Sequence, residues 1–186
     1  MTDPPIYTRG MRSCPLFLAL ILSSALVTAE SAGGLRWTMP TGWRAQPERP
    51  MRAATYTVAA ASGDREPGEC AVFFFGRGQG GSVQDNIDRW RSQIQGPDGK
   101  PAVAKIDKQQ VQGLTITRVD SSGGYSGMGG PMAPSTRALP NYRLLGAVVE
   151  GPGGNSIFVK FTGPAATVAS NSKHFEQLLA SFQVDK

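Results

Sequence analysis

Cys70-Ala-Val-Phe-Phe-Phe-Gly-Arg-Gly-Gln-Gly-Gly-Ser82 is the stretch that decides the fold, because it joins a predicted strand to a predicted helix. Residues 70–75 are apolar throughout, which is typical of a central strand covered on both faces. The glycines that follow end the strand, and Ser82 is a natural N-cap for a helix. Asp85, three residues further on, completes a variant of the capping box.

The predicted helix is amphipathic and has a clear end. Its apolar residues, Val83, Ile87, Trp90 and Ile94, recur at helical spacing and lie on one face. Gly-Pro-Asp-Gly at residues 96–99 then stops the helix. We therefore expect it to pack on a sheet through its apolar face.

Strand patterns and turns extend outward from this unit on both sides. Runs rich in β-branched and apolar residues predict strands, and a second amphipathic helix follows Gly163-Pro164. Strands joined by short turns form antiparallel sheets. The predicted fold class is therefore α+β, with an antiparallel sheet of about six to seven strands flanked by two main helices. The further predicted strands are residues 35–37, 51–60, 102–109, 114–120, 142–150 and 156–162.

Composition agrees with a single folded domain. The chain has 186 residues, of which 40% are hydrophobic and 18% charged, and its net charge of +5 is spread along the sequence. Its 23 Gly and 14 Pro exclude a coiled coil or a helical bundle, and the apolar fraction excludes a disordered protein. We expect one domain over residues 35–186, a short tail at 30–34, and a flexible loop at 121–140 that is rich in Gly, Ser, Pro and Met.

The N-terminus has the pattern of a signal peptide. Arg9 and Arg12 precede an apolar stretch at residues 16–27, and Val27-Thr28-Ala29 then offers a cleavage site. A helix of that length reaches about 18 Å, which is short of the ~30 Å apolar core of a membrane. We therefore predict a signal peptide over residues 1–29 rather than a membrane anchor. Residues 1–10 are interpreted as an artefactual extension, because Met11-Arg12 is a more typical start.

Export has consequences for partners and for disulfides. The mature protein would be periplasmic or extracellular, without a stable membrane span, and nucleic acid is not expected as a partner. Cys14 would leave with the signal peptide, so Cys70 would remain without a disulfide partner and the fold would depend on its hydrophobic core. We expect a monomer.

Two short motifs carry a resemblance to a known family. Trp37-Thr-Met-Pro-Thr-Gly-Trp43 resembles the Pro-x-Gly-Trp opening of PsbP-like domains, and Leu178-Leu-Ala-Ser-Phe182 resembles the end of their last helix. The resemblance spans most of residues 35–184 and implies an α/β/α sandwich. The family includes an extrinsic subunit of photosystem II and a nuclear Ran-binding protein, so it implies binding or assembly rather than catalysis. It assigns no functional residue here.

The glycine-rich turn is the first candidate site. Gly76-Arg-Gly-Gln-Gly-Gly81 fits G-x-G-x-x-G between a strand and a helix, where free N–H groups hold anions. Under this hypothesis Arg77 contacts an anionic group of a ligand or partner. The alternative is that the glycines only allow a sharp turn. A nucleotide site is disfavoured, because residues 102–109 are too charged for a buried parallel strand. The candidate anion-binding residues are Arg77, Gly78, Gly80, Gly81 and Ser82.

The remaining candidates lie in the long loop and on scattered side chains. Tyr125, Met128 and Met132 are candidates for an adaptable contact surface, with a soft-metal site as the alternative. His174 is the only histidine, so neither a zinc site nor a catalytic triad is expected. We expect no cofactor and no metal.

The function most consistent with these patterns is an exported, non-enzymatic binding or assembly module. Its partner would be an unidentified protein or a component of the cell envelope. The alternative is a small extracytoplasmic hydrolase or another enzyme whose site is not visible in the sequence. A deep pocket with converging titratable groups would favour the enzyme, and a shallower surface would favour the binding module.

Overall fold

An antiparallel sheet of eight strands, seen in the computed structural model of residues 29–127 and 138–185, forms the centre of the fold. Each strand pairs with neighbours that run the other way, and β7 pairs with β8 beside the main path. The sheet order is β3-β4-β5-β10-β9-β8-β6. The strands are β3 (Arg44–Ala45), β4 (Ala54–Val58), β5 (Gly68–Phe73), β6 (Ile94–Gln95), β7 (Ala104–Val111), β8 (Leu114–Tyr125), β9 (Leu139–Glu150) and β10 (Ser156–Pro164).

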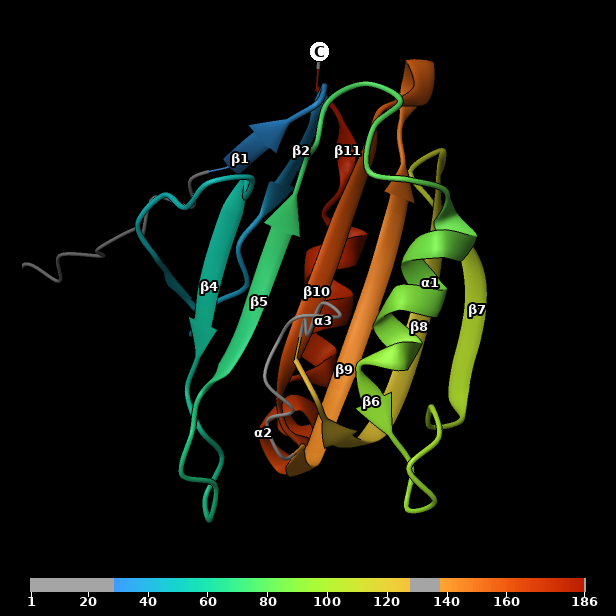
Figure 1. Ribbon diagram of the computed structural model, residues 1–186. Coiled ribbons are helices and arrows are strands. Elements are labelled where there is room, and N and C mark those ends of the chain that lie inside the picture. Colours follow the sequence, from blue (N-terminus) through green and yellow to red (C-terminus); the bar gives the residue numbers. More distant parts are fainter. Residues whose placement is uncertain (1–28, 128–137, 186) are drawn as a thin grey trace, which may run out of the picture.

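Helices cover both faces of this sheet. Helix α1 (Val83–Ser92) lies over β9 and β8 on one face, and α2 (Ala165–Ser170) and α3 (Ser172–Ala180) lie on the other (Figure 1). The alternation of side chains along β10 separates two cores. Phe158 faces α1 with Trp90, whereas Phe161 faces α3 with Phe175. The predicted α+β fold is therefore confirmed, as is the expected α/β/α layering.

A second, three-stranded sheet joins the two ends of the described chain. Strand β1 (Ala29–Ala32) pairs with β2 (Leu35–Thr38), which also pairs with β11 (Gln183–Val184). The tight turn between β1 and β2 uses Gly33 and Gly34, both with positive φ. Residues 29–32 thus form a paired strand, and the expectation of a tail at 30–34 is wrong. Glu30 accepts a hydrogen bond from the Tyr56 hydroxyl, which fixes β1 to the core.

The motif that suggested the PsbP-like resemblance is part of the aromatic core. Trp37 stacks on Phe182 with ring centroids 5.3 Å apart, and its Nε1 donates a 2.7 Å hydrogen bond to the Tyr56 hydroxyl. Trp43 packs against Phe161 and Tyr56. The residues of both motifs therefore contribute to packing, which agrees with their being structural rather than functional.

Several boundaries differ from those predicted. The first helix ends at Ser92, and Ile94 and Gln95 then form the short strand β6 against β8. Strand β8 continues to Tyr125 and β9 begins at Leu139, so the loop predicted at 121–140 is shorter at both ends. Residues 128–137 of that loop lie outside the described residues. No helix in the described part of the chain is long and apolar enough to cross a membrane.

Cys70 lies in the middle of β5, between β4 and β10. Its backbone pairs with those of Tyr56 and Phe161, and its side chain is fully buried. Burial raises the pKa of the thiol well above its ordinary value. Cys70 is therefore a small buried thiol within the core.

Candidate functional site

The glycine-rich turn has the backbone conformation that only glycine adopts easily. Gly76, Gly78, Gly80 and Gly81 all have positive φ, between 67° and 104°. A Cβ atom on Gly80 would also come within 2.6 Å of the Phe158 ring. These glycines are therefore required for the chain to pass from β5 into α1.

The start of α1 is occupied by its own capping residues. The Ser82 hydroxyl accepts a hydrogen bond from the Asp85 N–H at 3.1 Å, and the Ser82 N–H donates to the Asp85 carboxylate at 3.0 Å. The Ser82 hydroxyl also donates to the Asp85 carboxylate at 2.7 Å, and this hydrogen bond, followed by the one from the Ser82 N–H, lowers the pKa of Asp85. The carboxylate of Asp85 thus lies where a bound anion would lie. The predicted capping box is confirmed.

Arg77 points away from the helix start. Its Nε donates a 2.6 Å hydrogen bond to the carbonyl of Gly153, and the Gly78 N–H donates to the carbonyl of Gly154 at 3.0 Å. Both acceptors belong to the turn that joins β9 to β10. The structure therefore does not bring Arg77 together with Ser82 and Gly81 into one anion site.

Tyr125 lies at the end of β8 and contacts the sheet rather than a loop. Its ring stacks on that of Tyr142 with centroids 5.5 Å apart, and its hydroxyl accepts a hydrogen bond from Lys160. Met128 and Met132 lie outside the described residues. His174 contacts Asn171 on its own helix, with 3.2 Å between Nδ1 and Oδ1.

A groove of about 410 Å³ lies beside α1, and we call it the α1 groove. Helix α1 packs over β9 and β8, and no helix formed by residues 29–127 or 138–185 covers β5 and β4 on this face (Figure 1). The segment before β4 forms the far wall. The groove is lined by Pro50, Met51, Arg52, Phe73, Phe75, Asn86, Arg89, Trp90, Phe158 and Lys160.

The walls of the α1 groove are mainly aromatic. Phe75 stacks on Phe73 and packs against Phe158, with ring centroids 5.8 and 5.6 Å away. Trp90 lies directly on Gly146, where a Cβ would come within 2.5 Å of its ring. Met51, a residue that is 71% exposed, forms part of the outer edge. The groove therefore offers a flat apolar surface beside one flexible side chain.

Lys160 is the buried charged residue of the groove. It belongs to β10, is 8% exposed, and its Nζ donates to Gln93 Oε1 at 2.6 Å and to the Tyr125 hydroxyl at 3.1 Å. Burial lowers the pKa of Lys160 to about 8, with Glu69 opposing the effect and Arg52 adding to it. Its side chain lies on the same face of β10 as Phe158.

The other charged lining residues are also cations. Arg52 lies over the Phe73 ring at 5.5 Å, and its Nη1 donates to Glu69 at 2.8 Å and to Thr55 at 3.3 Å. Glu69 also pairs with Arg49 at 3.1 Å. Arg89 lies exposed on α1 at the opposite wall. One carboxylate is thus shared by two arginines beside a groove whose charged lining is entirely positive.

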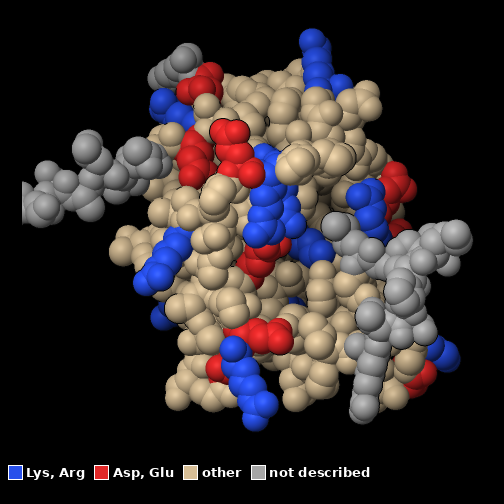
Figure 2. All heavy atoms as spheres, turned by 60° about the vertical axis from the view of Figure 1, so that its left-hand side comes forward, with Lys and Arg blue, Asp and Glu red and all other residues tan. Residues whose placement is uncertain are grey.

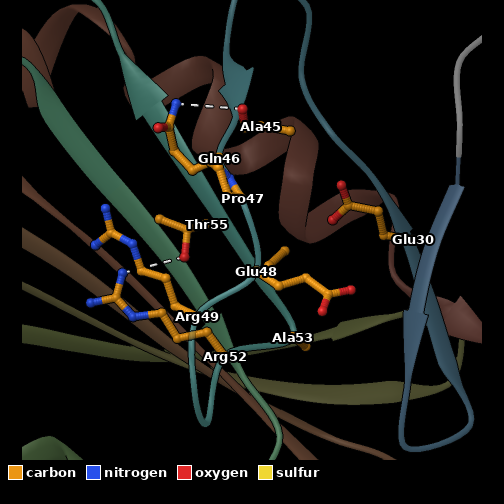
Figure 3. A pocket seen from close by; sticks show the side chains of 10 residues that line it. Glu30, Ala45, Gln46, Pro47, Glu48, Arg49, Arg52, Ala53 and Thr55 are labelled. Atoms are coloured by element: carbon orange, nitrogen blue, oxygen red, sulfur yellow. Dashed lines mark hydrogen bonds between the residues drawn. The ribbon is translucent and has the colours of Figure 1, made fainter.

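Two other hollows adjoin the α1 groove and share lining residues with it. One is a smaller pocket of about 240 Å³, where Arg49 and Arg52 extend to one side and Glu30 lies on the other (Figure 3). The second is lined by Gly80, Gly81, Asp85 and Arg89. Lys and Arg side chains also lie among Asp and Glu side chains on the face beside β4 (Figure 2).

Sequence patterns missed the main residues of the groove. Lys160 interrupts the apolar run of β10, and a single charge inside a predicted central strand is the signal that points to it. Among residues 29–127 and 138–185, no group of three His, Cys, Asp or Glu side chains lies close enough to hold a metal ion.

Comparison with known proteins identifies the fold but no sequence family. No family model and no curated protein matches the chain. Among solved structures, LpqN of Mycobacterium tuberculosis, involved in cell envelope biogenesis, is 9% identical, with 88% of each chain covered and a TM-score of 0.54. This likeness shows a shared fold.

Two further structures align over most of the chain. The cyanobacterial PsbP of Synechocystis is 13% identical, with 94% of this chain and 98% of that chain covered and a TM-score of 0.48. The Ran-binding protein Mog1p of Saccharomyces cerevisiae is 10% identical, with 86% and 97% covered and a TM-score of 0.46. The antiparallel sheet with helices on both faces agrees with the PsbP-like fold predicted from the sequence, and no functional residue is carried over.

Proposed function

We propose that this protein is an exported, non-enzymatic binding module that takes the apolar part of a ligand or envelope component into the α1 groove. The observation that carries the proposal is the groove itself. Its volume of about 410 Å³ lies in the range of small-molecule sites, and three phenylalanine rings form its walls. Covering these rings with a ligand removes apolar surface from water, which favours binding.

The charges at the groove support binding more than catalysis. Hydrolases that use general acid–base chemistry commonly pair two titratable groups whose environments give them different roles. Among the described residues that line the groove, Lys160 has a pKa of about 8, and no His, Asp or Glu accompanies it as a second acid or base. Glu69, the adjacent carboxylate, is held by Arg49 and Arg52. The hydrolase alternative therefore has less support than a binding function.

Export is supported by the signal-peptide pattern of the first 29 residues. LpqN, which shares the fold, is described as involved in cell envelope biogenesis. Both observations agree with a role outside the cytoplasm, where the module would hold a component of the envelope.

Two neighbouring phenylalanines provide a matched test of the binding site. Phe75 packs in the core on the α1 side, whereas Phe74 packs in the core on the α3 side, and both are half-buried. The probe is N-phenyl-1-naphthylamine, a neutral apolar dye whose fluorescence rises on binding. Phe75→Ala should weaken its binding about tenfold through lost ring contact, and Phe74→Ala should leave the affinity unchanged.

Stability is measured in parallel so that binding is compared only between folded proteins. Urea unfolding curves of both variants identify the conditions under which each is folded, and the titrations use those conditions. No binding by the wild-type protein, or equal losses in the two variants, would overturn the proposal that the α1 groove is the site.

A further inference from the structure

The α1 groove contains a buried positive charge without a carboxylate partner. Lys160 is 8% exposed, and no Asp or Glu side chain in the described part of the chain lies within 4.0 Å of its Nζ. Its two hydrogen-bond partners, Gln93 and Tyr125, are neutral. A buried ammonium group without a counter-charge is costly unless a partner supplies one.

Gln93 and Tyr125 hold this ammonium group in place and leave part of it available. A lysine ammonium has three N–H donors, and these two residues accept two of them. Gln93 follows α1 and Tyr125 ends β8, so two separate elements fix the position of Nζ. The third N–H donor is available to a ligand, because the Lys160 side chain lines the groove.

The apolar and charged parts of the groove are side by side. Phe158 and Lys160 are two residues apart on β10, which places them about 7 Å apart along one face of the strand. Phe158 pairs with Phe73 and Lys160 pairs with Ala71, so the rings continue across to β5 while the charge lies at one end. Arg52 lies over Phe73 and adds a second cation to the groove.

We infer that the ligand of the α1 groove is an apolar molecule with one anionic group, a carboxylate or a phosphate, and that Lys160 binds this group. This inference rests on the proposed function, because it names the class of ligand for the same groove. The rings of Phe73, Phe75 and Phe158 contact the apolar part. Lys160 then gains a directly bonded negative partner, which no Asp or Glu of the described residues supplies.

A pair of dyes with the same rings tests whether the negative charge is recognised. The anionic dye is 8-anilinonaphthalene-1-sulfonate, and the neutral dye is N-phenyl-1-naphthylamine, which lacks the sulfonate. The ratio of their two dissociation constants isolates the contribution of the charge. Lys160→Met keeps a side chain of similar length and removes the ammonium, and Lys173→Met on the opposite face is the control.

We expect Lys160→Met to weaken binding of the anionic dye about tenfold or more and to leave the neutral dye unchanged. Lys173→Met should change neither. If the neutral dye binds wild type and Lys160→Met equally, the groove is intact. An unchanged ratio between the two dyes would then refute the inference while the proposed function stands. Failure of the neutral dye to bind wild type would refute both.

The same test is available without a mutation. Raising the pH from 7 to about 10 removes the proton of Lys160 but leaves the sulfonate charged, so the preference for the anionic dye should fall in wild type. The other charged or titratable groups around the amine are Arg52, Arg89 and Glu69, together with Tyr125, whose pKa burial raises. A preference independent of pH would contradict the role of Lys160.

Discussion

Replacing Lys160 with methionine should change the pH dependence of stability in a way that the structure allows to be calculated. The pKa of Lys160 falls from its ordinary value of 10.5 to about 8 in the folded protein. Below pH 8 both states are protonated, and the lowered pKa corresponds to a destabilisation of about 3 kcal/mol. Between pH 8 and 10.5 the unfolded chain binds more protons, so this destabilisation disappears as the pH rises.

Methionine carries no proton in either state, so Lys160→Met lacks this dependence. The unfolding free energy of the variant minus that of wild type should therefore fall by about 2–3 kcal/mol between pH 7 and pH 10. The loss of the hydrogen bonds to Gln93 and Tyr125 also lowers the stability of the variant, by about 1–3 kcal/mol. The change of the difference with pH, rather than its value at one pH, is thus the predicted quantity.

Urea unfolding curves of Lys160→Met and wild type at several pH values measure this difference in unfolding free energy. Cys70 and Tyr56 have raised pKa values and make both proteins less stable as the pH rises, and this contribution cancels in the difference. A difference that stays constant from pH 7 to pH 10 would refute the reasoning, since Lys160 would then titrate alike in the folded and unfolded states.

Three further predictions concern α1, the glycine turn and the N-terminus. In urea unfolding, Ser82→Ala should cost about 0.5–2 kcal/mol through loss of the capping box, whereas Trp90→Ala should cost about 3–5 kcal/mol because the ring is buried. Arg77→Ala should cost less than about 1 kcal/mol and leave binding of the anionic dye unchanged, because its exposed guanidinium bonds Gly153; weaker dye binding would restore the turn as an anion site. N-terminal sequencing of exported protein should give Glu30 as the first residue, and a chain in the membrane fraction that begins at residue 1 or 11 would contradict this.

The predictable parts of the fold are the strands and helices long enough to show a periodic pattern of apolar residues. Residues 70–90 predict β5, the turn and α1, and glycine-containing turns predict the hairpins β7–β8 and β9–β10. Strands β1, β3, β6 and β11 have two to four residues each, too few for a periodic pattern. Their existence depends on partners elsewhere in the chain, such as β2 for both β1 and β11.

The site was less predictable, because its residues are joined only by the fold. Lys160 meets Gln93 and Tyr125 across separations of 67 and 35 residues, which no local pattern reveals. The hypothesis for Arg77 used only the residues next to it. The Gly153 carbonyl that accepts a hydrogen bond from the Arg77 guanidinium lies 76 residues away in sequence. This hydrogen bond holds Arg77 away from its expected position over the helix start.

The burial of Cys70 makes its thiol a built-in reporter of local unfolding. In a chain that begins at Glu30 it is the single thiol, and its raised pKa keeps it from the thiolate form that reacts with alkylating reagents. A reagent reaches the sulfur only when β5 separates from β4 and β10, the centre of the larger sheet. The rate of alkylation in native buffer therefore reports how often that centre opens, and ligands of the α1 groove should slow it in proportion to their occupancy.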